Sequence, residues 1–372
     1  MSGAIYICCR VFNIKIVKMV SIYYSKMNSS FHHFSANATF VGPPPTFHQI
    51  LAIVLMSIKI ILNSIGLLLN CLLLWLIISN YQKLHKTFSI LLTYTLINDC
   101  LISVTLLLTI KRIVQCHETL AMVFFGPCTF VSTSFCHVLD AVHLHALQNW
   151  ILSQILLIGF RTAMLSSAQS FISMKRTITF CMLAWLPGLI SLGLHVTYRF
   201  SRPRLLELIH RCYSEDFSYS YISGYESFYN SPIPFTIAML LLPNIPHYFL
   251  AYCFRHKQNN DLKRTTMSMT TLRMHSTLRK VSTMKAFLPL FLLADVLIYF
   301  FCQLELLPPQ FIEYFLGTIS SSINILNPVI AMCCFRPYRK MFKEYYRLII
   351  SKLSAHPKVM FSEGSSDEVV NL

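Results

Sequence analysis

The sequence predicts an all-α membrane protein: a bundle of seven transmembrane helices, with an amphipathic helix after the seventh span. Seven apolar segments are each long enough to cross a bilayer, because about 20 helical residues at about 1.5 Å each span a hydrocarbon core of about 30 Å. The composition agrees, since 55% of the 372 residues are hydrophobic and only 12% are charged. Soluble domains carry about 25% charged residues.

The predicted spans run approximately over residues 50–79, 87–110, 131–160, 178–197, 233–254, 286–307 and 311–335. Helix-breaking residues separate them. Gly42 and the three prolines after it precede the first span, and Pro308 with Pro309 sets a very short loop between the last two. Prolines also fall inside spans, where neighbouring helices and water satisfy the carbonyl groups that they free: Pro187, Pro243, Pro246, Pro289 and Pro328.

The distribution of basic residues predicts the orientation. The tail after Phe335 and the alternate loops that share its side hold twenty Lys and Arg, whereas the opposite side after Met27 holds six. Because basic residues concentrate on the cytoplasmic side, the tail is expected inside and the N-terminus outside. We therefore divide the chain into a mostly disordered extracellular segment (1–49), a transmembrane domain (50–335) and a cytoplasmic tail (336–372).

Two N-glycosylation acceptor patterns precede the first span and fit the same orientation. They are Asn28-Ser29-Ser30 and Asn37-Ala38-Thr39. Residues 1–26 are moderately apolar but contain Arg10, Lys15 and Lys18, and they resemble neither a signal peptide nor an eighth span.

Polar residues recur inside several spans. Asn70 lies in the first span, Asp99 in the second and Arg161 at the end of the third; the fourth holds Trp185 with Pro187 and the seventh Asn327 with Pro328. This pattern resembles the polar skeleton of rhodopsin-like receptors. The resemblance implies a rhodopsin-like architecture and a polar network of Asn70, Asp99 and Asn327 that holds sodium or water. The alternative is a cluster of polar groups that only pack together.

Three motifs are more specific. The seventh span ends in Asn324-Ile325-Leu326-Asn327-Pro328, followed eight residues later by Pro337-Tyr338-Arg339. Gly126-Pro127-Cys128 is followed by Cys136 and His145, and Lys285-Ala286-Phe287-Leu288-Pro289 opens the sixth span. Over about residues 50–345 the chain resembles nematode serpentine receptor class delta, a family of chemosensory G-protein-coupled receptors.

That resemblance implies a function. It implies a multi-pass receptor of the plasma membrane, sensory cilia included, that detects a small-molecule cue, as in olfaction, and activates a heterotrimeric G protein. The sequence departs from the pattern around Arg161, where flanking aromatic residues are partly missing, and after Asn-Pro, where Met332, Cys333 and Cys334 replace the expected Tyr. Both departures touch the activation machinery.

The third span carries the candidate ligand site. Asp140, His143 and Leu147 share one helical face at spacings of three and four. A charge within the bilayer is costly unless it faces protein or water, so we expect these residues, with Asp295 of the sixth span, to line a ligand pocket. Structural hydrogen bonding is the alternative. A metal site is not expected, because the remaining histidines are scattered singly. Lys59, in the outer half of the first span, is interpreted as a snorkelling side chain.

Four cysteines lie at or near the predicted outer face, and they allow three pairings: Cys116, Cys128, Cys136 and Cys212. The receptor resemblance implies a bridge from the top of the third helix to the second outer loop, about 25 residues or about 37 Å before the arginine. Cys136 stands at that distance from Arg161. We therefore expect Cys136 to pair with Cys212, and Cys116 with Cys128.

The inner face is expected to contact the G protein. Arg161 closes the third span, and Lys263 and Arg264 lie in a basic loop suited to an acidic partner. In the tail, apolar residues at helical spacing alternate with basic ones and predict an amphipathic helix on the inner leaflet: Tyr338, Met341, Phe342, Tyr345, Tyr346, Ile349 and Ile350.

Several functions are excluded by pattern. No Lys lies within 311–335 for a retinal Schiff base, and no nucleophile-elbow arrangement of Ser, His and Asp appears. We therefore expect no enzyme, no cofactor and no nucleic-acid partner, but a small-molecule ligand, a heterotrimeric G protein and the lipid bilayer. The alternative is a transporter or channel for a small solute, which inverted repeats or paired broken helices would favour; neither is found.

Overall fold

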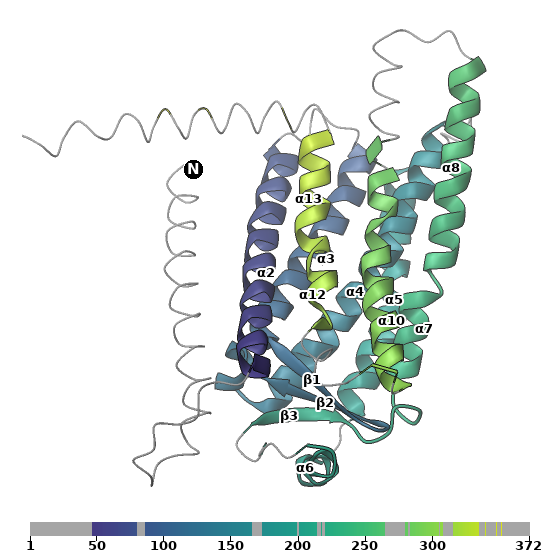
Figure 1. Ribbon diagram of the computed structural model, residues 1–372. Coiled ribbons are helices and arrows are strands. Elements are labelled where there is room, and N and C mark those ends of the chain that lie inside the picture. Colours follow the sequence, from purple (N-terminus) through teal and green to yellow (C-terminus); the bar gives the residue numbers. More distant parts are fainter. Residues whose placement is uncertain are drawn as a thin grey trace, which may run out of the picture.

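The computed structural model describes residues 47–334, apart from 80–85, 166–172, 199–200, 214–216, 218–219, 265–279, 282, 305 and 308–314, together with residues 339, 347 and 351. A helical bundle occupies most of this part of the chain (Figure 1). The helices of the bundle are α2 (Phe47–Ser79), α3 (Lys86–Thr109), α4 (Thr133–Leu165), α5 (Met174–Thr197), α7 (Ile233–Leu241), α8 (Asn244–Arg264), α10 (Leu288–Gln303), α12 (Thr318–Ser321) and α13 (Ile323–Cys334).

Within the described residues, six helical segments have the length and apolar composition to cross a membrane. They are Val54–Ser79, Ser89–Thr109, Thr133–Phe160, Met174–Thr197, Ile233–Lys257 and Thr283–Gln303. The seventh predicted span appears as a shorter apolar helix, Thr318–Cys333, which begins after a turn at Gly317. The helices expose large apolar side chains such as Ile61, Phe249 and Ile245, as lipid-facing surfaces require.

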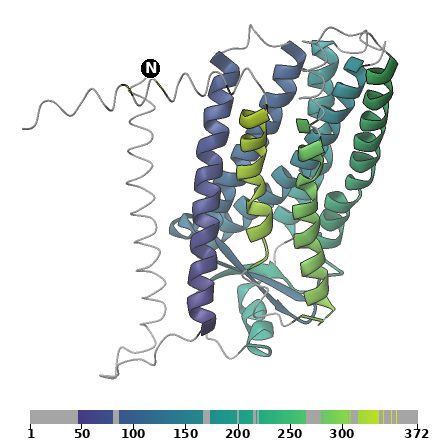
Figure 2. The ribbon, with the colours of Figure 1, turned by 45° about the horizontal axis from the view of Figure 1, so that its top comes forward.

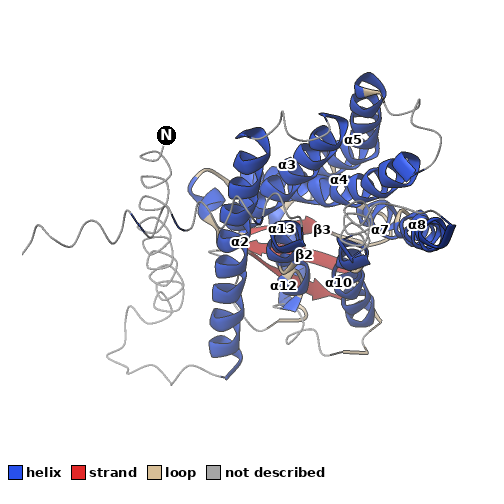
Figure 3. Ribbon diagram, turned by 90° about the horizontal axis from the view of Figure 1, so that it is seen from above, coloured by secondary structure: helices blue, strands red, loops and turns tan. Residues whose placement is uncertain are grey.

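Helix α4 lies at the centre of the bundle. It packs against α3, α5, α7 and α8, and Trp150 near its middle is fully buried (Figure 3). The predicted fifth span is divided at Pro243 into α7 and α8, since proline lacks the N–H that a continuous helix needs. The central position of α4 gives its polar side chains access to the interior of the bundle and keeps them away from lipid.

A three-stranded antiparallel sheet corrects the all-α prediction. Strands β1 (Lys111–Cys116) and β2 (Thr119–Phe124) form a hairpin, and β3 (Tyr221–Tyr225) pairs with β2. The sheet crosses one end of the bundle, with the short helix α6 (Arg202–His210) beyond it, and we call this end the sheet end (Figures 1 and 2). β1 mixes Lys111, Arg112 and Gln115 with apolar residues, and β2 is apolar after Thr119, so neither strand shows the alternation that predicts a half-buried strand.

The predicted disulfide pairing is wrong. The structure joins Cys116 to Cys212 and Cys128 to Cys136, with Cα–Cα distances of 5.8 and 5.1 Å. The unpredicted hairpin explains the difference, because it carries Cys116, at the end of β1, to Cys212, two residues after the end of α6. A 3-10 helix, η3 (Pro127–Phe130), turns Cys128 back towards the first turn of α4, where Cys136 lies. The predicted glycosylation sites Asn28 and Asn37 and the apolar residues of the predicted amphipathic helix fall outside the described residues.

Candidate functional site

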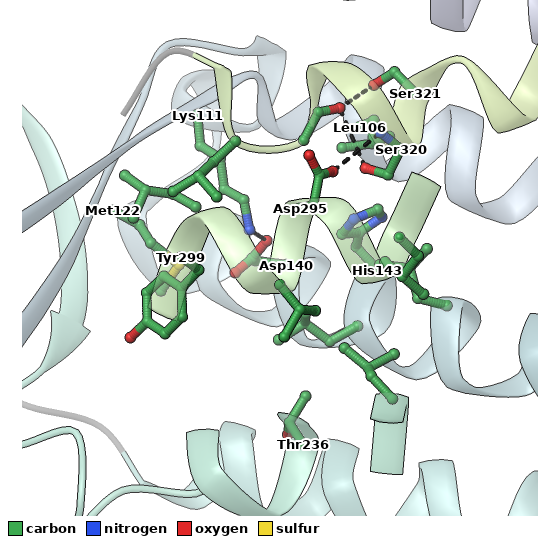
Figure 4. A pocket seen from close by; sticks show the side chains of 18 of the residues that line it. Leu106, Lys111, Met122, Asp140, His143, Thr236, Asp295, Tyr299, Ser320 and Ser321 are labelled. Carbon is green, nitrogen blue, oxygen red and sulfur yellow. Dashed lines mark hydrogen bonds and ion pairs between the residues drawn. The ribbon is translucent and has the colours of Figure 1, made fainter. Parts of the chain in front are cut away.

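A cavity of about 200 Å³ lies among the helices next to the sheet (Figure 4). Its lining is mostly apolar, and the sheet contributes Leu120, Met122 and Tyr225. All four residues predicted to bind a ligand line this one cavity: Asp140, His143, Leu147 and Asp295. The structure therefore brings together residues of the third and sixth spans, while ligand binding itself stays a prediction.

Asp140 forms an ion pair that the sequence did not predict. Its Oδ1 accepts from the ammonium group of Lys111, the first residue of β1, and both side chains are largely buried. Ile110 allows this placement by turning the chain from α3 into β1 with a φ of 23°, a conformation that β-branched residues rarely adopt. Sequence reasoning counted Lys111 only as an outer charge, because nothing in the sequence indicated that a strand would begin there.

His143 and Leu147 continue the same face of α4. The Nδ1 atom of His143 lies 3.3 Å from the hydroxyl of Thr105 on α3, and both side chains are buried. Leu147 packs in the apolar cluster that includes Trp150 and Leu292. The lining of the cavity therefore contains charged groups near the sheet and is apolar deeper in the bundle.

Asp295 and Lys59 form a second polar corner of the cavity, on α10 and α2. The Oδ2 atom of Asp295 accepts from the backbone N–H of Ser320 at 3.0 Å, and Lys59 Nζ donates to the Leu316 carbonyl at 2.7 Å. Gly317, at φ 80°, makes the turn between these two backbone positions, a conformation that favours glycine. The interpretation of Lys59 as a snorkelling side chain is wrong, because its ammonium group reaches into the bundle.

A chain of hydrogen bonds ties the sheet to the helices on the other side of the cavity. His195 contacts the Tyr225 hydroxyl through Nδ1 and the Thr236 hydroxyl, at 2.6 Å, through Nε2. His137 links the Ser223 hydroxyl, at 3.0 Å, to the His195 carbonyl, at 2.8 Å. Burial, with the nearby Asp140 carboxylate, raises the pKa of Tyr225, so its phenol stays protonated. Sequence reasoning missed this group except for His137, since its members come from four separate segments.

The predicted polar network is assembled in part. Asn327 donates through Nδ2 to Asp99 Oδ2, and both side chains are fully buried. Asn70 instead donates to the Asn324 carbonyl at 3.0 Å, while the Asn324 side chain donates to Asn63 Oδ1 at 2.7 Å. The structure therefore ties α2 and α3 to α13 through neighbouring turns. Binding of sodium or water there stays a prediction.

The predicted coupling residues lie at the end of the bundle opposite the sheet. Arg161 belongs to the last turns of α4, and Lys263 with Arg264 ends α8. Their side chains lie outside the described part of the structure, so their role in coupling stays a prediction.

The described residues thus form a bundle of apolar helices with a cavity among them, the architecture of a helical membrane protein. The chain belongs to the family described as serpentine type 7TM GPCR chemoreceptor Srd, whose model matches residues 55–344. This confirms the resemblance drawn from the Asn-Pro and Pro-Tyr-Arg motifs. The protein is thus an integral membrane protein of a chemoreceptor family.

Curated relatives agree with that assignment. The chain is similar to serpentine receptor class delta-18 of Caenorhabditis elegans, with 28% identity over 291 residues that cover 76% of this chain and 85% of the relative. It is also similar to class delta-3 (26% over 298 residues, 77% and 86%) and class delta-19 (26% over 310 residues, 81% and 90%) of the same organism.

Proposed function

We propose that this protein is a chemoreceptor of the plasma membrane that binds a small-molecule cue in the cavity beside the sheet and activates a heterotrimeric G protein. The observation that carries the proposal is the convergence of Asp140, His143, Leu147 and Asp295 on one cavity within the bundle. Buried charged groups in an apolar, concave lining are the usual composition of a small-molecule site.

The orientation follows from the disulfides and the basic residues. Both bridges lie at the sheet end, and disulfides persist in oxidising compartments, so this end faces outward. The opposite end carries Arg161, Lys263 and Arg264, and basic residues favour the cytoplasmic side. A cue from outside therefore reaches the cavity from the sheet end, and the G protein binds at the opposite end of the bundle.

Signalling would proceed by population shift. The cavity contacts both α10 and α12, and α12 leads directly into α13, whose Asn327 bonds to Asp99 below the cavity. A cue that binds one arrangement of these helices more tightly makes that arrangement accumulate. Pro328 lies inside α13 and weakens the backbone hydrogen bonding of that helix, where such a rearrangement can occur. Membership of a receptor family favours this mechanism over enzyme catalysis or solute transport.

The experiment is a G-protein activation assay in heterologous cells, with a small-molecule library and variants at matched surface density. Leu147→Trp fills the apolar part of the cavity and should abolish the response to any active compound. The control is Ile245→Trp on α8, where the side chain is 69% exposed and does not line the cavity; it should respond normally. A compound that activates Leu147→Trp as well as the original protein would place its site elsewhere.

A further inference from the structure

The cavity holds a carboxylate with an unused acceptor beside a lysine with unused donors. Asp295 is only 7% exposed, and its Oδ1 accepts no hydrogen bond from any described residue. An ammonium group has three N–H donors, and Lys59 uses one of them on the Leu316 carbonyl. Both residues line the cavity, and within the described structure no ion pair of 4.0 Å or less joins them.

The separation of the Lys59 and Asp295 charges determines which ligand groups can bind between them. Opposite charges in a low-dielectric lining attract each other, and these two are close enough to interact electrostatically. Each is instead held by the backbone of the segment that precedes or begins α12: Lys59 by the Leu316 carbonyl and Asp295 by the Ser320 N–H. A single ligand hydroxyl between them accepts a hydrogen bond from the ammonium group and donates its O–H to the carboxylate.

The remaining charges constrain the ligand further. The lysines and aspartates that line the cavity are Lys59, Lys111, Asp140 and Asp295, two basic and two acidic residues, and Lys111 with Asp140 already forms a pair. An amine or a carboxylate would add a net charge to an otherwise apolar enclosure, where uncompensated charge is costly. The balance therefore favours an uncharged ligand.

We infer that the cavity binds an uncharged, largely apolar alcohol, whose hydroxyl donates to Asp295 Oδ1 and accepts from Lys59 Nζ. Its hydrocarbon part would lie against Leu106, Leu147, Leu292 and Val296. This inference rests on the proposed function and names its ligand class. An ether or ketone can only accept and would leave the carboxylate oxygen without a donor, which is how sites built for a hydroxyl reject analogues that lack it.

The test measures binding without signalling. The purified full-length protein in nanodiscs is titrated with 1-alkanols from four to ten carbons, and at each length with the primary amine, the carboxylic acid and the methyl ether. Thermal unfolding gives the stabilisation by each probe, from which the dissociation constant follows. We expect the best alcohol to bind about tenfold or more tightly than the other three compounds of its length.

Variants test the role of the corner. Lys59→Met and Asp295→Leu each remove one charge and should weaken alcohol binding about tenfold or more. The double variant Lys59→Met/Asp295→Leu restores the charge balance, which guards against misfolding, and it should bind the methyl ether as tightly as the alcohol. The control is Leu297→Ala, two residues from Asp295 on the lipid-exposed side of α10, and should keep the preference for the alcohol.

The outcomes separate the two proposals. Tighter binding of an amine or a carboxylate, no binding across the panel, or an unchanged preference for the alcohol in the double variant would overturn the alcohol assignment. A different result would overturn the receptor proposal. In that case an alcohol would saturate the cavity, yet it would neither activate the G protein nor compete with an active compound.

Discussion

At the scale of single residues, the Lys111–Asp140 pair links the sheet to the central helix. Both partners are largely buried, whereas the pairs Arg204–Glu226 and Arg211–Glu207 lie at the surface. A buried pair contributes little net stability by itself, but breaking it leaves an uncompensated charge. Its main effect is therefore to hold β1 in one position against α4.

This predicts strong coupling between the two residues. Lys111→Met or Asp140→Asn alone should lower the free energy of unfolding by about 3–5 kcal/mol, whereas the double variant should recover most of the loss. Thermal and denaturant unfolding give the free energies of unfolding of the original protein, the two single variants and the double variant, and these yield the coupling energy between the two residues. Additive losses would show that the two groups act independently.

At the scale of elements, α2 packs closely against α13. A Cβ on Gly66 would lie 2.8 Å from the Asn324 Cβ, whereas a Cβ on Gly159 or Gly193 would meet nothing within 4 Å. Small residues at helix interfaces allow backbones to approach within a membrane. The hydrogen bonds of Asn70 and Asn63 to α13 depend on that approach.

The glycines supply a matched test. Gly66→Ala should destabilise the protein by about 1–3 kcal/mol through overpacking, while Gly193→Ala should stabilise it slightly, by up to about 1 kcal/mol, because alanine favours the helix. Melting temperatures of the two variants, measured at equal protein concentration, test both expectations. Equal effects would mean that α2 and α13 do not pack this closely.

The two disulfides also act on elements. Cys116–Cys212 closes a loop with a sequence separation of 96 and ties the hairpin to α6, whereas Cys128–Cys136 spans only 8. Loop-closure entropy grows with length, so Cys212→Ser should cost about 2 kcal/mol more than Cys128→Ser. Cys116→Ser together with Cys212→Ser should cost no more than either alone. Peptide mapping that found Cys136 joined to Cys212 would contradict the pairing.

At the scale of the whole molecule, the cavity and the coupling residues lie towards opposite ends of one bundle. The proposed outward face carries the sheet and both disulfides, and the inward face carries the end of α4 (Figure 1). A signal must therefore pass along helices such as α10, α12 and α13.

The orientation is testable by itself. A tag placed after Leu372 should be reached by antibody only in permeabilised cells, because the basic side of the chain is proposed to face the cytoplasm. Labelling on intact cells would reverse the assignment of the two ends.

Arg161 provides the corresponding test of coupling. Arg161→Ala should abolish or strongly reduce G-protein activation while ligand binding persists, since Arg161 belongs to the last turns of α4, at the end proposed to face the G protein. Lys175→Ala, a second basic substitution expected on the same side, serves as the control. Full signalling by Arg161→Ala at matched surface density would mean that Arg161 contributes only to the excess of basic residues on the cytoplasmic side.

The sequence by itself determined the apolar spans, their order, the family, and the face shared by Asp140, His143 and Leu147. These properties depend on local composition and helical periodicity, which a single segment carries. Only the tertiary structure decided the sheet, the disulfide pairing, the partner of Asp140 and the inward direction of Lys59. Each of these joins residues from distant segments: Lys59 meets Leu316, and Cys116 meets Cys212. Such contacts depend on how the helices pack and on a hairpin at the end of the bundle, and helical periodicity carries no information about either.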